Sequence, residues 1–147
     1  MTTTPSETLR DRICRLRLER EERKSANRRP RNQSPSTAER AEILKKTDGN
    51  CHICGGTIVG DWQADHVKAH SGGGEHSLDN YLPAHPICNN YRWDYLEEEF
   101  QLILKLGVWA RTQIEKNTKV GQEIGAGFAK HEEHRMSRRK HGPDSVR

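Results

Sequence analysis

The chain has 147 residues, 31% of them hydrophobic and 31% charged, which suits a single domain with a small apolar core rather than two cores. It has no apolar run near the roughly 20 residues of a membrane span, and its first residues lack the pattern of a secretory signal. The net charge is +4, with basic residues in excess on both sides of a slightly acidic segment, 41–90. This distribution favours contact with a polyanion around a central cation, although charge runs alone are also typical of solvated surface.

A charged helix is predicted over residues 6–24, with Ser6 as its N-cap. Its apolar stripe is narrow and consists of Leu9, Ile13 and Leu16. We therefore expect this helix to fray or to dock on a partner. Cys14 has no second metal ligand nearby and is interpreted as a packing residue or a free thiol. The basic segment that follows, residues 25–35, is predicted to be a linker without fixed structure.

The centre of the chain is predicted to hold one short helix and short strands. Ser36 and Glu39 have the spacing of a capping box, which begins a helix that extends to about Lys46. Asp48-Gly49 then turns the chain. A glycine-rich loop at residues 69–77 separates the later strands. The segments that suit strands are 53–59, which contains a tight turn at Gly55-Gly56, then 62–67 and 80–84.

Helices dominate the C-terminal part of the predicted structure. Hydrophobic residues recur at helical spacing from about Ile87, and Gly107 is expected to interrupt this helix. A second helix is predicted from 108 to about 116, and a third begins near Thr118. The basic tail from Arg135 is predicted to be disordered.

Two pairs of metal ligands, Cys51-His-Ile-Cys54 and His85-Pro-Ile-Cys88, are the strongest chemical signal. A tight turn can direct both side chains of such a pair at one ion, and two such turns complete a tetrahedral site. Thiolate and imidazole ligands select zinc, which would be structural in a closed four-ligand site. His52 is the substitute ligand if His85 does not bind. The alternative is that the first two cysteines are buried or redox-active and that His85 lies on the surface.

Asp65-His66, a glycine-rich loop, Asn80, Asn89 and Arg92 follow in this order between and just after the ligand pairs. The ordered set, over about residues 40–95, resembles the HNH endonucleases, which have the ββα-metal nuclease fold, in their zinc-ribbon-containing subtype. The resemblance implies an α+β fold: a small ββα-metal core with a structural zinc knuckle pair, flanked by helices.

The resemblance also implies a role for each polar residue of this set. His66 would be the general base that takes a proton from the attacking water, since an imidazole titrates near neutrality. Asp65 and Asn89 would hold a catalytic cation, Mg²⁺ or Mn²⁺, through their side-chain oxygens. Asn80 would hydrogen-bond backbone near His66 and fix the ring, and Arg92 would clamp a phosphate group.

Two positions depart from the family pattern. The third signature residue is Asn89 rather than histidine, and Asn90 beside it leaves open which asparagine binds the cation. The second ligand pair, or zinc knuckle, begins with His85 where cysteine is usual, and this replacement affects how tightly zinc would bind. Taken singly, Asn89 could cap the following helix and Arg92 could be solvated. The loop histidines that receive no role beyond proximity to phosphate are His70 and His76.

The function implied by the resemblance is hydrolysis of DNA phosphodiester bonds, with RNA left open as a substrate. The predicted parts are an N-terminal extension at 1–35, the nuclease domain at 36–106, a helical extension at 107–139 and a disordered tail at 140–147. The helices of the two extensions could dock a protein partner, and no membrane contact is expected. A cytoplasmic protein encoded by a bacterium or a phage is the expected setting.

Two other functions are compatible with the ligand pairs. One is a non-catalytic zinc-ribbon module that binds nucleic acid or a partner protein, and the other is a redox or zinc-storage role for the thiols. A binding module has no need of Asp65, His66 and Asn89 at one point. Convergence of these three side chains therefore separates the nuclease hypothesis from the others.

Overall fold

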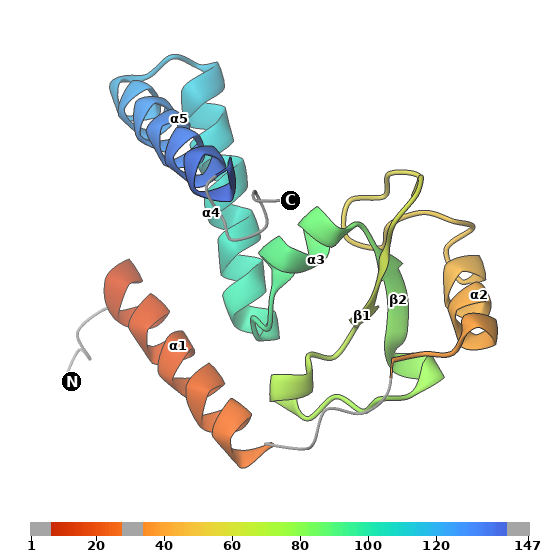
Figure 1. Ribbon diagram of the computed structural model, residues 1–147. Helices are drawn as coiled ribbons and strands as arrows, with labels where there is room; N and C mark the ends of the chain where they lie inside the picture. Colours follow the sequence, from red (N-terminus) through yellow and green to blue (C-terminus); the bar gives the residue numbers. More distant parts are fainter. Residues whose placement is uncertain (1–6, 28–33, 141–147) are drawn as a thin grey trace. The chain divides into compact units, whose positions relative to one another are not determined.

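The computed structural model describes residues 7–27 and 34–140 (Figure 1). The chain forms two compact units, Met1–Phe100 and Gln101–Arg147. The predicted Ser6 cap and parts of the predicted linker and tail lie outside the described residues. Among the helices of the described ranges, none is both long and apolar enough to cross a membrane.

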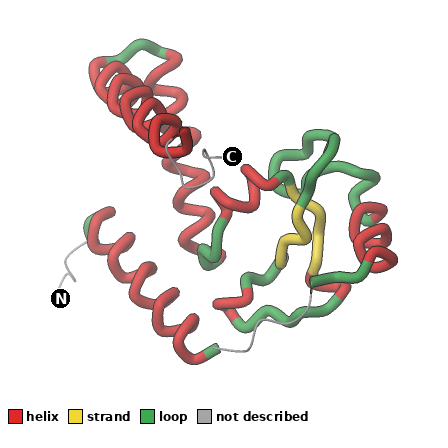
Figure 2. The backbone as a smooth tube through the Cα atoms, in the orientation of Figure 1, coloured by secondary structure: helices red, strands yellow, loops and turns green. Residues whose placement is uncertain are grey.

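The first unit contains an antiparallel strand pair followed by a short helix (Figure 2). β1, Gln63–His66, pairs with β2, Tyr81–Ala84, in a register that sets His66 opposite Tyr81. α3, Pro86–Arg92, follows β2 directly and packs against β1. Two strands followed by a helix, with further helices around them, confirm the predicted α+β fold with a small ββα core.

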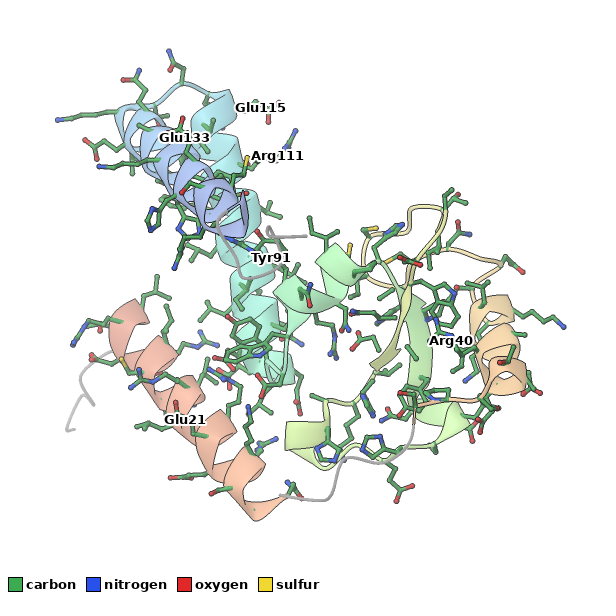
Figure 3. The ribbon with its side chains drawn as sticks, viewed as in Figure 1. Glu21, Arg40, Tyr91, Arg111, Glu115 and Glu133 are labelled. Atoms are coloured by element: carbon green, nitrogen blue, oxygen red, sulfur yellow. The ribbon has the colours of Figure 1, made fainter. Side chains whose placement is uncertain are left out.

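α2, Thr37–Lys45, contacts β2 and begins with the predicted capping box. The Ser36 hydroxyl accepts a hydrogen bond from the Glu39 N–H, while the Glu39 carboxylate accepts one from the Ser36 N–H at 2.8 Å. On the same helix, the Arg40 guanidinium lies 3.9 Å from the centre of the Trp62 ring and donates to the Trp62 carbonyl at 3.0 Å (Arg40 is labelled in Figure 3). These contacts hold the helix beside the chain that enters β1.

The strand predicted within residues 53–59 is wrong. This segment, which is described throughout, contributes one isolated bridge to Asn50 and no regular strand. Gly55 has a φ of +74° and turns the chain, so that the Cys51 N–H donates to the Gly56 carbonyl at 2.8 Å. The backbone groups that a strand would need are therefore used within the turn that carries the first two cysteines.

α1, Leu9–Ala26, docks on its own chain rather than fraying. Its N-cap is Thr8, two residues after the predicted one. The helix packs against the 3₁₀ turn η1, His70–Gly72. Its buried Arg20 donates to the buried carboxylate of Glu99 at 3.0 Å. A charged helix with a narrow apolar stripe is thus held to the first unit by a buried ion pair as well as by packing.

The break after α3 lies at Trp93, not at Gly107 as predicted. Trp93 has a φ of +50°, a left-handed conformation that bulky residues rarely adopt, and its N–H closes α3 on the Asn89 carbonyl at 2.8 Å. The Arg20 guanidinium covers the Trp93 ring, 4.5 Å from its centre. α4, Glu97–Glu115, then continues through Gly107, because an interior glycine costs a helix only about 1 kcal/mol relative to alanine.

The second unit consists of the rest of α4 and of α5, Lys119–Lys140. Thr118 precedes α5, as predicted, and its hydroxyl accepts a hydrogen bond from the Gly121 N–H at 3.1 Å. Residues 135–140, predicted to be disordered, are the last turns of this helix. Basic residues are favourable there because they interact with the negative end of the helix dipole.

The glycine-rich loop at residues 69–77 is closed by Asn80, the last residue of the 3₁₀ turn η2, Leu78–Asn80. The Asn80 amide oxygen accepts from the Lys68 N–H at 2.9 Å, and its nitrogen donates to the carbonyls of Lys68 at 3.1 Å and Glu75 at 2.8 Å. A Cβ at Gly74 would lie 1.8 Å from the Lys68 carbonyl oxygen. A side chain at this position would overlap the Lys68 backbone, so the close approach of the loop to Lys68 requires glycine.

We expect Gly74→Ala to lower the free energy of unfolding by more than about 1 kcal/mol, because the added methyl group overlaps the Lys68 backbone. Gly72→Ala is the matched control: its Cβ would meet the Leu96 side chain at 3.7 Å, an ordinary contact, and should change stability by less than about 0.5 kcal/mol. Denaturant unfolding of both variants measures the difference. Equal effects would contradict the close approach at Gly74.

Candidate metal centre and charged cleft

The two predicted ligand pairs meet at one point. Cys51 and Cys54 flank the turn before β1, while His85 and Cys88 lie at the start of α3. The ligand atoms of the four residues all lie within 4.8 Å of one another. The N–H of His85 also donates to Cys51 Sγ at 3.4 Å, which joins the two turns directly. These residues can hold a metal ion, as their spacing in the sequence predicts.

The His85 ring is oriented as a metal ligand. Its Nδ1 lies 3.4 Å from Cys54 Sγ and 3.9 Å from Cys88 Sγ. Its Nε2 lies 3.2 Å from the carbonyl oxygen of Thr57. Because a carbonyl only accepts hydrogen bonds, Nε2 carries the proton and Nδ1 keeps its lone pair on the side of the thiols. A backbone carbonyl that fixes the tautomer in this way is typical of metal-binding histidines.

The thiols of the cluster have unequal acidity. Burial raises the pKa of Cys51, but the N–H groups of Cys54, His85 and Ile53 outweigh it and bring the pKa to about 6. Burial and the neighbouring thiols raise the pKa of Cys88 to about 12. The cluster alone therefore favours one thiolate and resists further ones. A soft divalent cation would stabilise several thiolates at the same time. Three sulfurs with one imidazole nitrogen fit zinc in a structural site.

His52 lies within the first knuckle but outside the ligand cluster. Its Nε2 is 2.8 Å from Oδ2 of Asp65, a buried carboxylate on β1. The substitute role considered for His52 is not needed, because His85 completes the group of four ligands. His52 instead connects the metal centre to the next group of polar residues.

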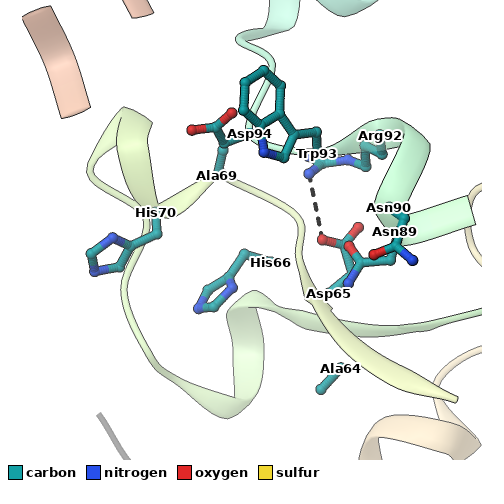
Figure 4. A pocket seen from close by; sticks show the side chains of 10 residues that line it. All are labelled: Ala64, Asp65, His66, Ala69, His70, Asn89, Asn90, Arg92, Trp93 and Asp94. Atoms are coloured by element: carbon teal, nitrogen blue, oxygen red, sulfur yellow. Dashed lines mark hydrogen bonds and ion pairs between the residues drawn. The ribbon is translucent and has the colours of Figure 1, made fainter. Parts of the chain in front are cut away.

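A cleft beside the metal centre collects polar residues of the sequence motif (Figure 4). It is lined by residues from the end of β1, from α3 and from the turn after α3. The predicted catalytic residues in its lining are Asp65, His66, Asn89 and Arg92, and Asn90 lines it as well. The cleft lining thus contains a carboxylate, an imidazole and an amide, the three kinds of group that the nuclease hypothesis names.

Asp65 is 5% exposed and both of its oxygens face cationic or donor groups. Oδ2 contacts His52, and Oδ1 lies 3.5 Å from an Arg92 nitrogen, which is the dashed line in Figure 4. The other terminal nitrogen of Arg92 donates to the Val67 carbonyl at 2.7 Å. Arg92 is thus anchored to the end of β1, not freely solvated, and its predicted contact with phosphate stays a prediction.

His66 is the last residue of β1 and lies among other rings. Its Nε2 is 3.1 Å from Nδ1 of His76, which is itself 2.8 Å from the Tyr81 hydroxyl. Burial and the charge of His76 lower the pKa of His66 to about 4, against an opposing effect of Asp65. The His66 ring is therefore neutral at physiological pH, which is the form that can accept a proton.

Asn89 lies inside α3 and does not cap it, since the N-cap residue is His85. The Asn89 amide nitrogen donates to the side-chain oxygen of Gln63 at 2.7 Å. In this arrangement the Asn89 amide oxygen is not the atom that contacts Gln63, so it can bind a cation. Asn90, by contrast, is exposed.

Sequence reasoning missed three neighbours of the motif: Gln63, His76 and Tyr81. One signal was present for Gln63, because it lies two residues before Asp65 in a predicted strand and must share its face. No comparable signal marked His76 or Tyr81. The β1–β2 register and the closed loop bring these two residues beside His66.

Comparison with known proteins bears on this region of the chain. A family model described as HNH endonuclease matches residues 51–92. The match begins at the first cysteine of the metal centre and ends at Arg92 of the cleft. The chain has no match among curated proteins.

We expect the purified full chain to contain about one zinc ion per molecule, and Cys51→Ser to lose it, because a structural site requires all four ligands. Cys14→Ser is the matched control, since Cys14 lies on α1 outside the cluster. Elemental analysis after dialysis measures the zinc content, and a chelator should lower the thermal stability of the wild type. Full zinc content in Cys51→Ser would contradict the assigned ligand set.

Proposed function

We propose that this chain, whose residues 51–92 form an HNH endonuclease domain, is a metal-dependent endonuclease that hydrolyses phosphodiester bonds of DNA. The observation that carries the proposal is the shared cleft of Asp65, His66 and Asn89. These side chains supply a carboxylate, a neutral imidazole and an amide, and hydrolysis of a phosphodiester uses such groups to activate water and to neutralise developing charge. A module that only binds nucleic acid needs none of them together.

His66 is the proposed general base. Its Nε2 faces His76 at 3.1 Å, so Nδ1 is the nitrogen left to accept the proton of the attacking water. In that tautomer His66 Nε2 carries the ring proton and can donate a hydrogen bond to His76 Nδ1. Burial keeps the ring neutral before the reaction, since it lowers the pKa of His66 to about 4. The carboxylate of Asp65, the residue before His66 in β1, favours the His66 imidazolium that forms when the ring takes the proton.

Asp65 and Asn89 are the proposed ligands of a catalytic Mg²⁺ or Mn²⁺. Both offer hard oxygen atoms in the cleft, and the amide of Asn89 is oriented by Gln63 so that its oxygen is available. A divalent cation bound there would stabilise the negative charge that develops on the phosphate and on the departing 3′ oxygen. Arg92, at the same cleft, is the proposed contact to a phosphate oxygen.

We expect the wild type to cut plasmid DNA when Mg²⁺ or Mn²⁺ is added and to stop when a chelator removes it. His66→Ala should reduce the cleavage rate by about 10²- to 10⁴-fold, the usual contribution of a general base. His131→Ala is the control, because His131 is an exposed histidine of α5 in the second unit. Cleavage that survives in His66→Ala would remove the base assignment. No cleavage of DNA or RNA with any divalent cation would favour the zinc-ribbon binding module.

The adjacent asparagines provide a second test. Asn89→Ala should raise the Mn²⁺ concentration needed for half-maximal cleavage at least about ten-fold, since it removes a proposed ligand. Asn90→Ala, in the same cleft but exposed, should leave this concentration unchanged. The measurement is a cleavage rate over a series of Mn²⁺ concentrations with zinc held constant. The reverse result would transfer the ligand role to Asn90.

A further inference from the structure

Both the backbone and the ring of His52 make contacts that fix its position. It lies between two ligands of the metal centre, Cys51 and Cys54. Its backbone N–H donates to the Pro83 carbonyl of β2 at 3.0 Å. Its ring nitrogen Nε2 lies 2.8 Å from Oδ2 of Asp65, and the two side chains are only 14% and 6% exposed. A short contact between two nearly buried groups has little freedom to rearrange.

This contact restricts the Asp65 carboxylate. The carboxylate of an aspartate rotates readily about its Cβ–Cγ bond. A cation that binds through one particular oxygen is held more tightly when this rotation is restricted. His52 holds Oδ2, which leaves Oδ1 as the oxygen on the side of Arg92, a residue of the cleft lining. The position of Oδ1 therefore follows from the position of the His52 ring.

We propose that His52 is a positioning residue that fixes Asp65 for cation binding and thereby couples the zinc knuckle to the cleft. The inference rests on the proposed role of Asp65 as a ligand of the divalent cation. The turn between Cys51 and Cys54 sets the position of His52. Tight cation binding at Asp65, 11 to 14 positions further along the chain, therefore requires that this turn be properly formed. Loss of a hydrogen-bonding partner of a ligating carboxylate typically weakens metal affinity about 10- to 100-fold.

Three variants of the full chain separate positioning from general support. In His52→Gln the amide nitrogen lies near the place of Nε2 and can still donate to Oδ2. In His52→Asn the amide is one bond shorter and cannot reach Oδ2, although the side chain stays polar. In His52→Leu the volume is similar and the donor is absent. Zinc content and thermal unfolding of each variant establish that the knuckle is intact.

The measurement is Mn²⁺ affinity by calorimetric titration of the zinc-loaded protein without DNA. We expect the Kd to rise about 10- to 100-fold in His52→Leu and His52→Asn and to stay within about three-fold of the wild type in His52→Gln. Wild-type affinity in His52→Asn at full zinc content would overturn the inference. Equal weakening in His52→Gln and His52→Asn would also overturn it, because the hydrogen bond would then not be the cause.

Asp65→Asn distinguishes this inference from the proposed function. If the wild type binds Mn²⁺ and Asp65→Asn does not, the cation site stands, and the His52 series alone decides the positioning role. If the wild type does not bind Mn²⁺, the proposed cation site fails and the inference fails with it.

Discussion

The meeting of four ligand atoms within 4.8 Å is the constraint on which the rest of the first unit depends. Cys51 and Cys54 lie before the strand pair, and His85 and Cys88 lie at the start of α3 after it, so their convergence joins the two ends of the strand pair. A chain with only 31% hydrophobic residues has little apolar surface to bury for the same purpose. A metal ion shared by the four residues would supply cohesion that packing cannot.

The last two residues of β1, Asp65 and His66, have different surroundings. Asp65 faces the donors of His52 and Arg92, so a buried carboxylate, which is costly when unpaired, is compensated on both oxygens. His66 faces the ring of His76, and burial favours its neutral form. Two adjacent residues of one strand therefore line the same cleft with different partners.

The N-terminal helix α1 is joined to this core by charge as much as by apolar contact. Arg20 is buried, donates to Glu99 and covers the ring of Trp93, whose left-handed backbone ends α3. A buried guanidinium without its carboxylate would be strongly unfavourable, so the pair also selects one docking position for the helix. Trp93 itself lines the cleft, and the helix thus supports one wall of the proposed active site.

Local patterns in the sequence were sufficient for the elements and the ligands whose signal lies within a few residues. The capping box at Ser36 and Glu39, the two ligand pairs and the two strands could all be predicted, because turn spacing and strand alternation act over short distances. The same reasoning misplaced the helix break at Gly107, because a glycine only weakens a helix. The helix ends instead at Trp93, whose backbone φ is positive.

The sequence by itself determined which kinds of metal ligand and which proposed catalytic groups this protein carries, and their order along the chain. Only the tertiary structure decided that His85 faces the thiols while His52 faces Asp65, and that His76 reaches His66. The physical reason is that the direction of each ring is set by backbone carbonyls and side chains brought together by strand register and loop closure, none of which is encoded in the spacing of the histidines themselves.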